Sequence, residues 1–236
     1  MTSLVRLFCP QPLACGSVVA IDRRQAHYLQ HVMRRVAGDR LRLFNGESGE
    51  FTGEIARFNR HGGEVLLGER LRTPLPEQTC ILSFALVKRT ATDLIVEKAT
   101  ELGATIIQPV VTSHTQAIRV NLERLNAIAT EATEQCERLS VPVIRDVVTL
   151  DSLLQSWPES RALFVAAERV DASPLAACSR DCGLLVGPEG GFTSRELDVL
   201  ARHPFVTLVS LGPWILRAET AAIAGLARLL AGHRPS

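Results

Sequence analysis

Residues 184–193 read Leu-Leu-Val-Gly-Pro-Glu-Gly-Gly-Phe-Thr, a run of apolar residues of strand length that passes directly into a glycine-rich loop. Glycine lets the backbone approach a ligand closely and adopt positive φ. Thr193 and Glu196 have the spacing of a capping box, which predicts a helix after the loop. The loop matches neither GxGxxG nor the Walker A pattern. It indicates a ligand-cradling turn between a strand and a helix, with a plain tight turn as the alternative.

Residues 211–221 repeat this arrangement as Leu-Gly-Pro-Trp-Ile-Leu-Arg-Ala-Glu-Thr-Ala. Arg217 can bind a phosphate or carboxylate. Glu219 falls in the expected first helical turn, where the helix dipole favours an anion. Because ligands bind beyond the carboxyl ends of parallel strands, we expect the two loops to line one pocket.

A third segment, residues 97–103, reads Glu-Lys-Ala-Thr-Glu-Leu-Gly and predicts a helix ended by a glycine C-cap. Glu97 and Glu101 share a helix face, and Lys88 lies just upstream. An acid–base pair and two solvated carboxylates both fit this pattern.

From residue 77 onward, apolar runs of strand length alternate with amphipathic segments of helix length, which predicts a mostly parallel sheet covered by helices. We expect strands at 81–87, 105–111, 141–144, 162–167, 184–187 and 206–211. The expected helices are 91–102, 122–139, 150–157, 194–202 and 217–230.

The first part of the chain has a different rhythm, with short apolar runs at 4–8, 17–21, 40–44, 53–58 and 64–67 separated by turn signals. One helical insert is expected at 24–35. Five strands at this spacing favour a small β-barrel. The stiff connector Thr73-Pro74-Leu75-Pro76 divides the chain into domains at 1–73 and 77–236.

Composition excludes several classes of protein. The 236 residues are 46% hydrophobic with net charge +1, which is typical of a globular chain rather than a disordered or collagen-like one. Residues 1–76 carry a net charge of +4 and the remainder −3, so a nucleic-acid partner and an ordinary solvated surface both remain open. No apolar run is long enough for a membrane helix, and the N-terminus has no signal-peptide core. We expect a cytoplasmic protein without a membrane partner.

No metal site is expected. The six cysteines form no CxxC pair and are interpreted as buried free thiols. His27 and His31 are four residues apart, but no third ligand or HExxH pattern accompanies them.

Together these motifs resemble the bacterial 16S rRNA (uracil-N3)-methyltransferase family, within the knotted SPOUT class of S-adenosylmethionine enzymes. The chain departs from that pattern at Trp214 and Ala218, where Arg and Thr are usual, near Leu125, where a Trp is usual, and at His114-Thr115, where Arg-Ser is common. The matching stretches follow family order along nearly the whole chain: 6–8, 31–34, 38–39, 43–46, 97–103, 134–138, 186–192 and 211–221.

The resemblance implies an α/β fold in which a small PUA-like β-barrel, residues 1–73, helps to hold rRNA. It implies a methyltransferase domain, residues 77–236, whose mostly parallel sheet ends in a trefoil knot that binds S-adenosylmethionine. It also implies a homodimer with the active site at the interface. The cofactor-binding residues carried over are Val186, Gly187, Pro188, Glu189, Gly190, Gly191, Leu211, Gly212, Ile215 and Leu216.

The implied reaction is methylation of N3 of a uridine in 16S rRNA, on the assembled small subunit. N3 carries a proton near neutral pH, so a base must remove it or a cation must stabilise the anion. Arg217, or Arg6 from the barrel of the partner subunit, is expected to supply the cation, and Glu219 or Glu101 to accept the proton or orient the arginine. RNA contacts are expected from Arg6, Arg34, Lys88, Lys98 and Arg138.

Three alternatives remain at this point. A related enzyme of the same fold would methylate ribose 2′-O instead of the base. A non-catalytic RNA-binding protein would bind rRNA without turnover. A small-molecule α/β enzyme would use the two Gly-Pro loops and keep its activity without residues 1–73.

Overall fold

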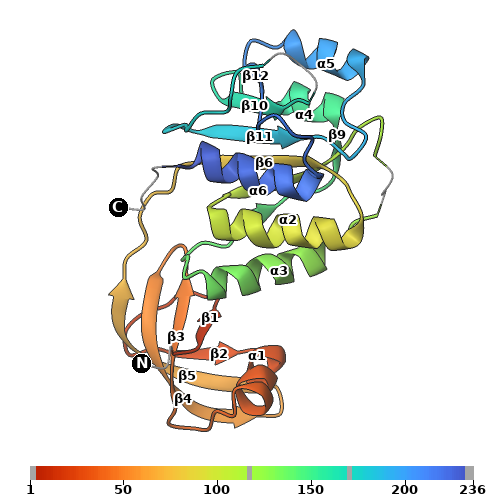
Figure 1. Cartoon of the computed structure of the whole chain (residues 1–236). Helices are drawn as coiled ribbons and strands as arrows, with labels where there is room; N and C mark the ends of the chain where they lie inside the picture. Colours follow the sequence, from red (N-terminus) through yellow and green to blue (C-terminus); the bar gives the residue numbers. More distant parts are fainter. Residues whose placement is uncertain (1–3, 116–118, 169–171, 232–236) are drawn as a thin grey trace. The chain divides into compact units, whose positions relative to one another are not determined.

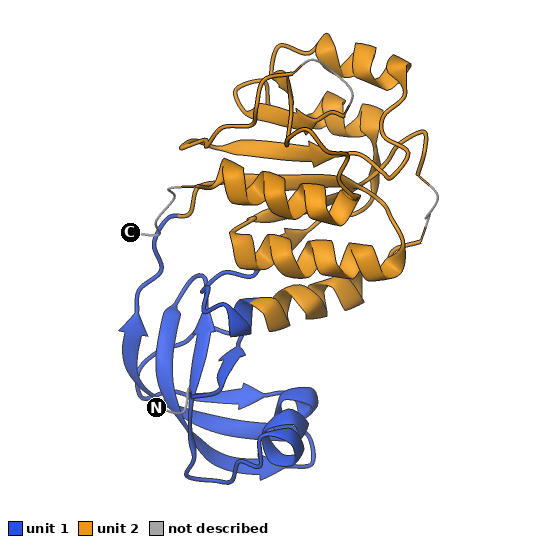
Figure 2. Ribbon diagram, in the orientation of Figure 1, with its two compact units in different colours: residues 1–76, 133–141 blue, residues 77–132, 142–236 orange. Residues whose placement is uncertain are grey.

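The computed structural model describes residues 4–115, 119–168 and 172–231 (Figure 1). The chain divides into two compact units (Figure 2). Unit 1 contains residues 1–76 together with 133–141, and unit 2 contains 77–132 and 142–236. The sequence-based division at 73–77 had assigned 133–141 to the second domain.

Unit 1 is built on a five-stranded sheet in the order β1-β3-β4-β5-β2, with β1 parallel to β3 and the other pairs antiparallel. Alternate residues of these strands face a common apolar core, as period-two strands require. That core includes Leu7, Leu41, Leu43, Ile55 and Val65. The strands are β1 (Arg6–Phe8), β2 (Val18–Ile21), β3 (Arg40–Asn45), β4 (Gly49–Asn59) and β5 (Gly62–Arg72).

The helical insert of unit 1 is shorter and less regular than expected. Asp22 and Gln25 form a capping box that starts α1 (Arg23–His27). The chain then continues as a π-helix, η1 (Tyr28–Val32), which ends before Arg34 adopts a positive φ of 53°. Leu29 is fully buried in the unit 1 core and anchors this segment.

Unit 2 is built on a parallel sheet in the order β12-β10-β11-β6-β7-β8, with the short β9 also paired to β7. This confirms the predicted mostly parallel α/β sheet. The two-residue strand β9 was not predicted, because its length gives no periodicity. The strands are β6 (Cys80–Ala85), β7 (Ile106–Val111), β8 (Val143–Ile144), β9 (Val148–Thr149), β10 (Ala162–Ala166), β11 (Cys182–Val186) and β12 (Val206–Val209).

Helices cover both faces of this sheet. On one face α2 and α6 lie side by side, with Gly225 of α6 close to Leu184 of β11 (Figure 1). On the other face α4 and α5 bury Trp157 and Leu200 against β10 and β11. The helices are α2 (Arg89–Leu102), α3 (Leu122–Gln135), α4 (Leu150–Ser156), α5 (Ser194–Ala201) and α6 (Ala218–Leu229).

Helix α3 ends at Gln135, four residues before the predicted end at 139. Glu137 has a positive φ of 63°, which breaks the helix. Residues 136–142 connect α3 to strand β8. The apolar Leu139, which prolonged the helical pattern in the sequence, is buried outside the helix.

Candidate active site

Three adjacent parallel strands bring their carboxyl ends together. Strand β10 lies between β11 and β12, and Ala166 at its end pairs with both Val186 and Val209. The loops that follow these strands therefore leave the sheet at the same edge, where α/β proteins bind their ligands. The two Gly-Pro loops predicted to meet do so here.

A cavity of about 600 Å³ lies between these loops. All ten residues expected to bind the cofactor line it, from Val186 to Gly191 and from Leu211 to Leu216. The sequence did not single out the third wall, residues 166–168, because these three residues include no glycine or proline to mark a loop. Phe192, Leu197 and Ser210 also line the cavity without having been predicted.

The glycines of the first loop meet specific neighbours. A Cβ at Gly187 would lie 3.0 Å from the ring of Phe192, and a Cβ at Gly190 would lie 3.3 Å from His114. Gly191 has a positive φ of 68°, a conformation that side chains disfavour. The loop therefore needs glycine for its own packing and turn as well as for access to a ligand.

Residues 112–115, which follow β7 and are remote in the sequence, form hydrogen bonds with this loop and with the start of α5. Nδ1 of His114 lies 3.0 Å from the carbonyl oxygen of Gly191 and 3.2 Å from that of Gly190. The backbone N–H of Ser113 donates to Glu196 at 2.8 Å. His114 stood out in the sequence only as a departure from the family pattern, since nothing in the local sequence indicates this contact.

Glu196 joins the two segments. Its carboxylate accepts hydrogen bonds from Ser113 N–H, Thr193 N–H and the Thr193 hydroxyl. Burial alone raises the pKa of Glu196, but these hydrogen bonds outweigh burial and leave the pKa below its ordinary value. The predicted capping box between Thr193 and Glu196 is confirmed, and it also fixes the loop after β7.

Arg217 and Glu219 stand at the start of α6. Arg217 is exposed at the N-cap, and within the described ranges it has no ion-pair partner. Glu219 is half-buried in the first turn. Neither side chain lines the cavity, whereas Ala218 and Ala221 of the same helix do. The pair therefore lies beside the cavity rather than inside it.

Glu101 lies in an ion-pair cluster on α2. Nζ of Lys98 is 2.7 Å from a carboxylate oxygen of Glu101 and 2.7 Å from one of Glu97. The hydrogen bonds that Lys98 donates to Glu101 and to Glu97 raise the pKa of Lys98 to about 12. The predicted shared face of Glu97 and Glu101 is confirmed, with Lys98 between them. Lys98 and Glu101 form an ion pair with each other, and neither side chain lines the cavity.

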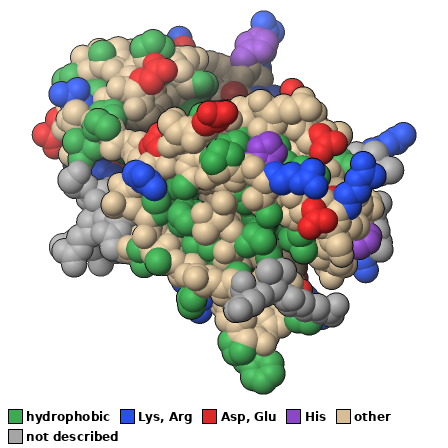
Figure 3. All heavy atoms as spheres, turned by 90° about the horizontal axis from the view of Figure 1, so that it is seen from above, with side chains coloured by type: hydrophobic (Ala, Val, Ile, Leu, Met, Phe, Trp, Pro, Cys, Tyr) green, Lys and Arg blue, Asp and Glu red, His purple; other side chains and the backbone are tan. Residues whose placement is uncertain are grey.

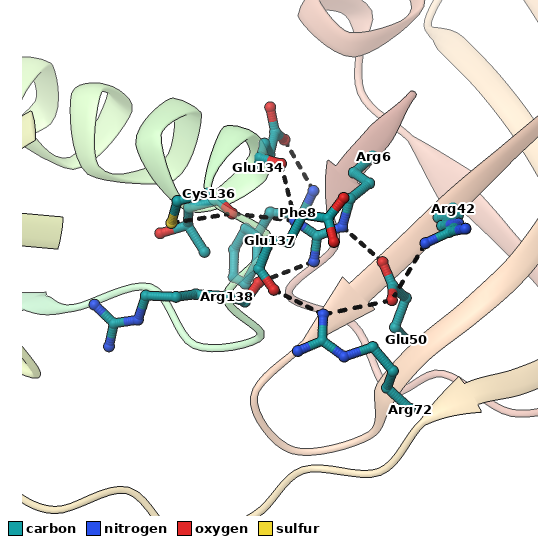
Figure 4. Close-up of polar contacts among 10 residues, drawn as sticks. Arg6, Phe8, Arg42, Glu50, Arg72, Glu134, Cys136, Glu137 and Arg138 are labelled. Atoms are coloured by element: carbon teal, nitrogen blue, oxygen red, sulfur yellow. Dashed lines mark hydrogen bonds and ion pairs between the residues drawn. The ribbon is translucent and has the colours of Figure 1, made fainter. Parts of the chain in front are cut away.

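Arg6 is buried in unit 1 and fully engaged there (Figure 4). Its Nε donates to Glu50 at 2.6 Å, and its two terminal nitrogens donate to the backbone carbonyls of Thr133, Glu134 and Arg138. The guanidinium also lies 4.1 Å from the ring centroid of Phe44. In this structure the donors of Arg6 satisfy the end of α3 and the buried Glu50, and its assignment to catalysis and RNA contact stays a prediction.

The remaining residues expected to contact RNA are dispersed. Arg34 follows η1 and Lys88 precedes α2, both with exposed side chains. Arg138 is half-buried, and its carbonyl accepts from Arg6. On the face seen from above, hydrophobic side chains reach the surface between charged side chains of both signs (Figure 3).

Trp214 is the most exposed of the large hydrophobic residues that the structure describes, at 80%, and the neighbouring Ile215 is 59% exposed. Both line the cavity. In the described parts of the chain, no three His, Cys, Asp or Glu side chains are grouped as metal ligands would be. No helix in the same residues has the length and apolarity to cross a membrane.

Comparison with known proteins agrees with this geometry. Residues 73–230 match a family described as RNA methyltransferase domain, and residues 21–67 match an RNA methyltransferase PUA domain. The chain is 38% identical over 235 residues to the ribosomal RNA small subunit methyltransferase E of Rickettsia conorii, covering 97% of this chain and 96% of the relative. It is 30% identical to the Bacillus subtilis protein of the same name, covering 89% and 88%.

Solved structures agree in fold over nearly the whole chain. The ribosomal RNA small subunit methyltransferase E of Neisseria gonorrhoeae, bound to S-adenosylmethionine, aligns with a TM-score of 0.87 at 27% identity over 97% of each chain. A Legionella pneumophila protein that also holds S-adenosylmethionine aligns with a TM-score of 0.86 at 28% identity over 98% of each chain. The chain belongs to the RNA methyltransferase family that includes the ribosomal RNA small subunit methyltransferases E.

Proposed function

We propose that this chain transfers the methyl group of S-adenosylmethionine to N3 of a uridine in 16S rRNA of the small ribosomal subunit. The single observation that carries the proposal is the cavity of about 600 Å³ at the ends of β10, β11 and β12. The family membership supports the choice of small-subunit rRNA as substrate. Ribose 2′-O methylation remains the alternative activity, and mass spectrometry of the methylated nucleoside distinguishes the two.

The residues present fit S-adenosylmethionine. The volume lies within the range of about 300–1,000 Å³ for small-molecule sites. Apolar side chains such as Val186, Leu211 and Leu216 suit a purine ring, and the glycine-rich backbone offers hydrogen-bonding groups at close range. When bound, the cofactor supplies an activated methyl group on a sulfonium centre.

The chain's own residues then have three tasks. The loops must hold the methyl carbon in line with N3 and keep water out, which is a matter of positioning. The exposed guanidinium of Arg217, next to the cavity, is placed to stabilise negative charge that develops on the uracil ring. A base must take the N3 proton. Glu219 lies on α6 between two residues that line the cavity, Ala218 and Ala221, whereas Glu101 lies on α2 and is paired with Lys98.

The target base must be unpaired or flipped out, because N3 lies on the Watson–Crick edge. Folded RNA or an assembled subunit is therefore the expected substrate. Unit 1, with a net charge of +4 over residues 1–76, is proposed to hold the RNA. We keep the trefoil knot, the homodimer with a shared site, and action in the cytoplasm as parts of the proposal, with light scattering as the measurement for the dimer.

The test uses purified full-length protein and radiolabelled S-adenosylmethionine. Label is expected to enter small ribosomal subunits from cells that lack this enzyme, and to be absent from large subunits. Calorimetry without RNA is expected to give one cofactor site per chain. Cofactor binding without label in any RNA would contradict the proposed function and favour a non-catalytic RNA-binding protein.

A further inference from the structure

Two glutamates are the only ionisable residues among the described residues that line the cavity at the ends of β10, β11 and β12. They are Glu168, which follows β10, and Glu189, which lies in the glycine-rich loop after β11. No lysine, arginine or histidine of the described ranges lines the cavity. The cavity wall therefore carries two carboxylates and, within those ranges, no basic side chain to balance them.

Sheet pairing brings the two carboxylates to the same edge of the cavity. Strands β10 and β11 are adjacent and parallel, and their last residues, Ala166 and Val186, pair with each other. Neighbouring strands of a sheet lie about 4.8 Å apart. Glu168 comes two positions after the end of β10, and Glu189 comes three positions after the end of β11. The two side chains thus enter the wall from neighbouring strand ends.

Hydrogen bonds hold the backbone beside each carboxylate. The N–H of Ala167, directly before Glu168, donates to a carbonyl of β12 at 3.1 Å. The N–H of Gly191 donates to the carbonyl of Pro188 at 2.8 Å, which closes a turn that contains Glu189. The positions from which both side chains start are therefore set by the sheet and the turn.

Both carboxylates remain available to a ligand. The side chains of Glu168 and Glu189 are exposed, and an exposed glutamate is negatively charged at neutral pH. Among the described residues, neither forms a hydrogen bond or an ion pair through its side chain. Arg217 adjoins the lining residues Leu216 and Ala218 in the chain but does not line the cavity itself. A positive charge on a ligand is accordingly favoured inside the cavity.

The methyl donor and its product differ by one such charge. S-adenosylmethionine carries a sulfonium, an ammonium and a carboxylate, whereas S-adenosylhomocysteine keeps the last two groups and has a neutral thioether in place of the sulfonium. Carboxylates attract the sulfonium by Coulomb's law and do not attract the thioether. Contacts to the adenine, the ribose and the amino-acid group are common to both molecules, so the ratio of the two affinities reports the charge at sulfur.

We propose that Glu168 and Glu189 make the cavity select the charged methyl donor over the uncharged thioether product, an inference that rests on the methyl transfer proposed above. The carboxylates favour the donor before transfer, and their attraction is lost when the sulfur becomes neutral, which promotes product release. They do not speed the chemical step, because the charge on sulfur declines in the transition state and stabilising it favours the ground state. Their role is cofactor selection.

The test is calorimetry of the full-length protein without RNA, with the donor and the product as separate ligands. Glu168→Gln keeps the size of the side chain and removes its charge. It is expected to weaken binding of S-adenosylmethionine about two- to fivefold relative to S-adenosylhomocysteine, the range of an exposed ion pair. The double variant Glu168→Gln with Glu189→Gln is expected to change this ratio further.

Glu159→Gln is the matched control. Glu159 is an exposed glutamate that precedes β10, at the opposite end of the strand that Glu168 follows, and it does not line the cavity. The substitution changes the net charge of the protein by the same amount, and the ratio of affinities is expected to stay as in the wild type. A change as large as that of Glu168→Gln would contradict a local effect of the cavity carboxylates.

Salt and a third ligand separate charge from the size of the methyl group. Raising the ionic strength from about 0.01 M to about 1 M shortens the Debye length from about 30 Å to about 3 Å, so the wild-type preference for the donor is expected to shrink. Sinefungin has a protonated amine where the donor has its sulfonium methyl group. Its affinity is expected to fall in Glu168→Gln as that of the donor does.

The possible outcomes separate this inference from the proposed function. An affinity ratio that is unchanged in Glu168→Gln and in the double variant would overturn the inference and leave the methyl transfer intact. Equal losses for donor and product would also overturn it, because the glutamates would then only shape the cavity. Failure of the wild-type protein to bind either molecule would overturn the proposed function itself.

Discussion

The carboxylate of Glu50 accepts a 2.6 Å hydrogen bond from Nε of Arg6, with both side chains buried inside unit 1. Arg42 and Arg72 approach the other carboxylate oxygen at 3.9 and 3.7 Å. Arg72 also donates to the carbonyl of Glu137 at 2.7 Å (Figure 4). Three arginines thus surround one buried carboxylate, and two of them, Arg6 and Arg72, fasten residues 133–138 to the strands of unit 1.

Arg6→Ala is expected to lower the free energy of unfolding by about 3–5 kcal/mol, because it leaves Glu50 buried with its closest partner removed. Urea denaturation measures this loss. Arg57→Ala is the control: its pair with Glu64 is solvent-exposed, so stability should barely change. A loss of turnover by Arg6→Ala at full stability would contradict the structural role and restore a catalytic one.

Gly190→Val is expected to weaken S-adenosylmethionine binding about tenfold or more, since a branched side chain would displace His114 and the loop that lines the cavity. Calorimetry on the folded variant gives the affinity. Gly16→Ala changes a glycine of unit 1 that has a φ of +79° and nothing within 4 Å of its Cβ position, so any backbone strain stays in unit 1 and the affinity should be unchanged. Wild-type affinity in Gly190→Val would count against the loop as the cofactor site.

Arg217→Ala is expected to reduce kcat about 100- to 1,000-fold, the effect of removing one group that stabilises transition-state charge. Cofactor affinity should be nearly unaffected, because the side chain does not line the cavity. Arg217→Lys keeps the charge and should recover part of the rate. Equal losses in turnover and cofactor affinity for Arg217→Ala would indicate a structural role.

Trp214→Ala is expected to weaken binding of the rRNA substrate about 5- to 100-fold, because the exposed indole offers a face on which one base can stack. Trp214→Phe keeps an aromatic face and should retain most of the affinity. Filter binding with small subunits measures both variants. An unchanged affinity would contradict this role in RNA binding. A halved mass of Trp214→Ala in light scattering would instead assign Trp214 to the contact between two copies of the chain.

Acid is expected to loosen the glycine-rich loop at 187–193 through Glu196. Its pKa is lower in the folded protein than in the unfolded chain, so its stabilising contribution is present above the unfolded pKa of about 4.3 and is lost as pH falls through the folded value. Glu196→Gln should flatten the decline of stability in that acidic range. Urea denaturation at several pH values measures the slope, and an unaltered slope would contradict the assignment.

Much of the fold follows from local patterns. Long apolar runs predicted the strands of unit 2, and the Gly-Pro pairs at 187–188 and 212–213 marked the loops that meet at the cavity. The loop after β10 joins them only through sheet order, since β10 pairs between β11 and β12. Strand order depends on long-range pairing, which periodicity does not encode.

Side-chain roles were harder to predict than backbone elements. Arg6 looks like any surface arginine in the sequence, and only the fold shows that three carbonyls and Glu50 occupy its donors. His114 is 76 residues from Gly190, and no spacing rule connects two loops on different strands. Burial and contact between distant segments decide these roles, and both arise from tertiary structure.

The most direct measurement is nucleoside mass spectrometry of 16S rRNA from enzyme-deficient small subunits, after incubation with this protein and S-adenosylmethionine. A new 3-methyluridine is expected, and it should be absent when the Arg217→Ala protein is used for the same time. A 2′-O-methylated nucleoside would keep the fold and cofactor but contradict base methylation. No methylated nucleoside, with cofactor binding confirmed, would contradict the proposed activity altogether.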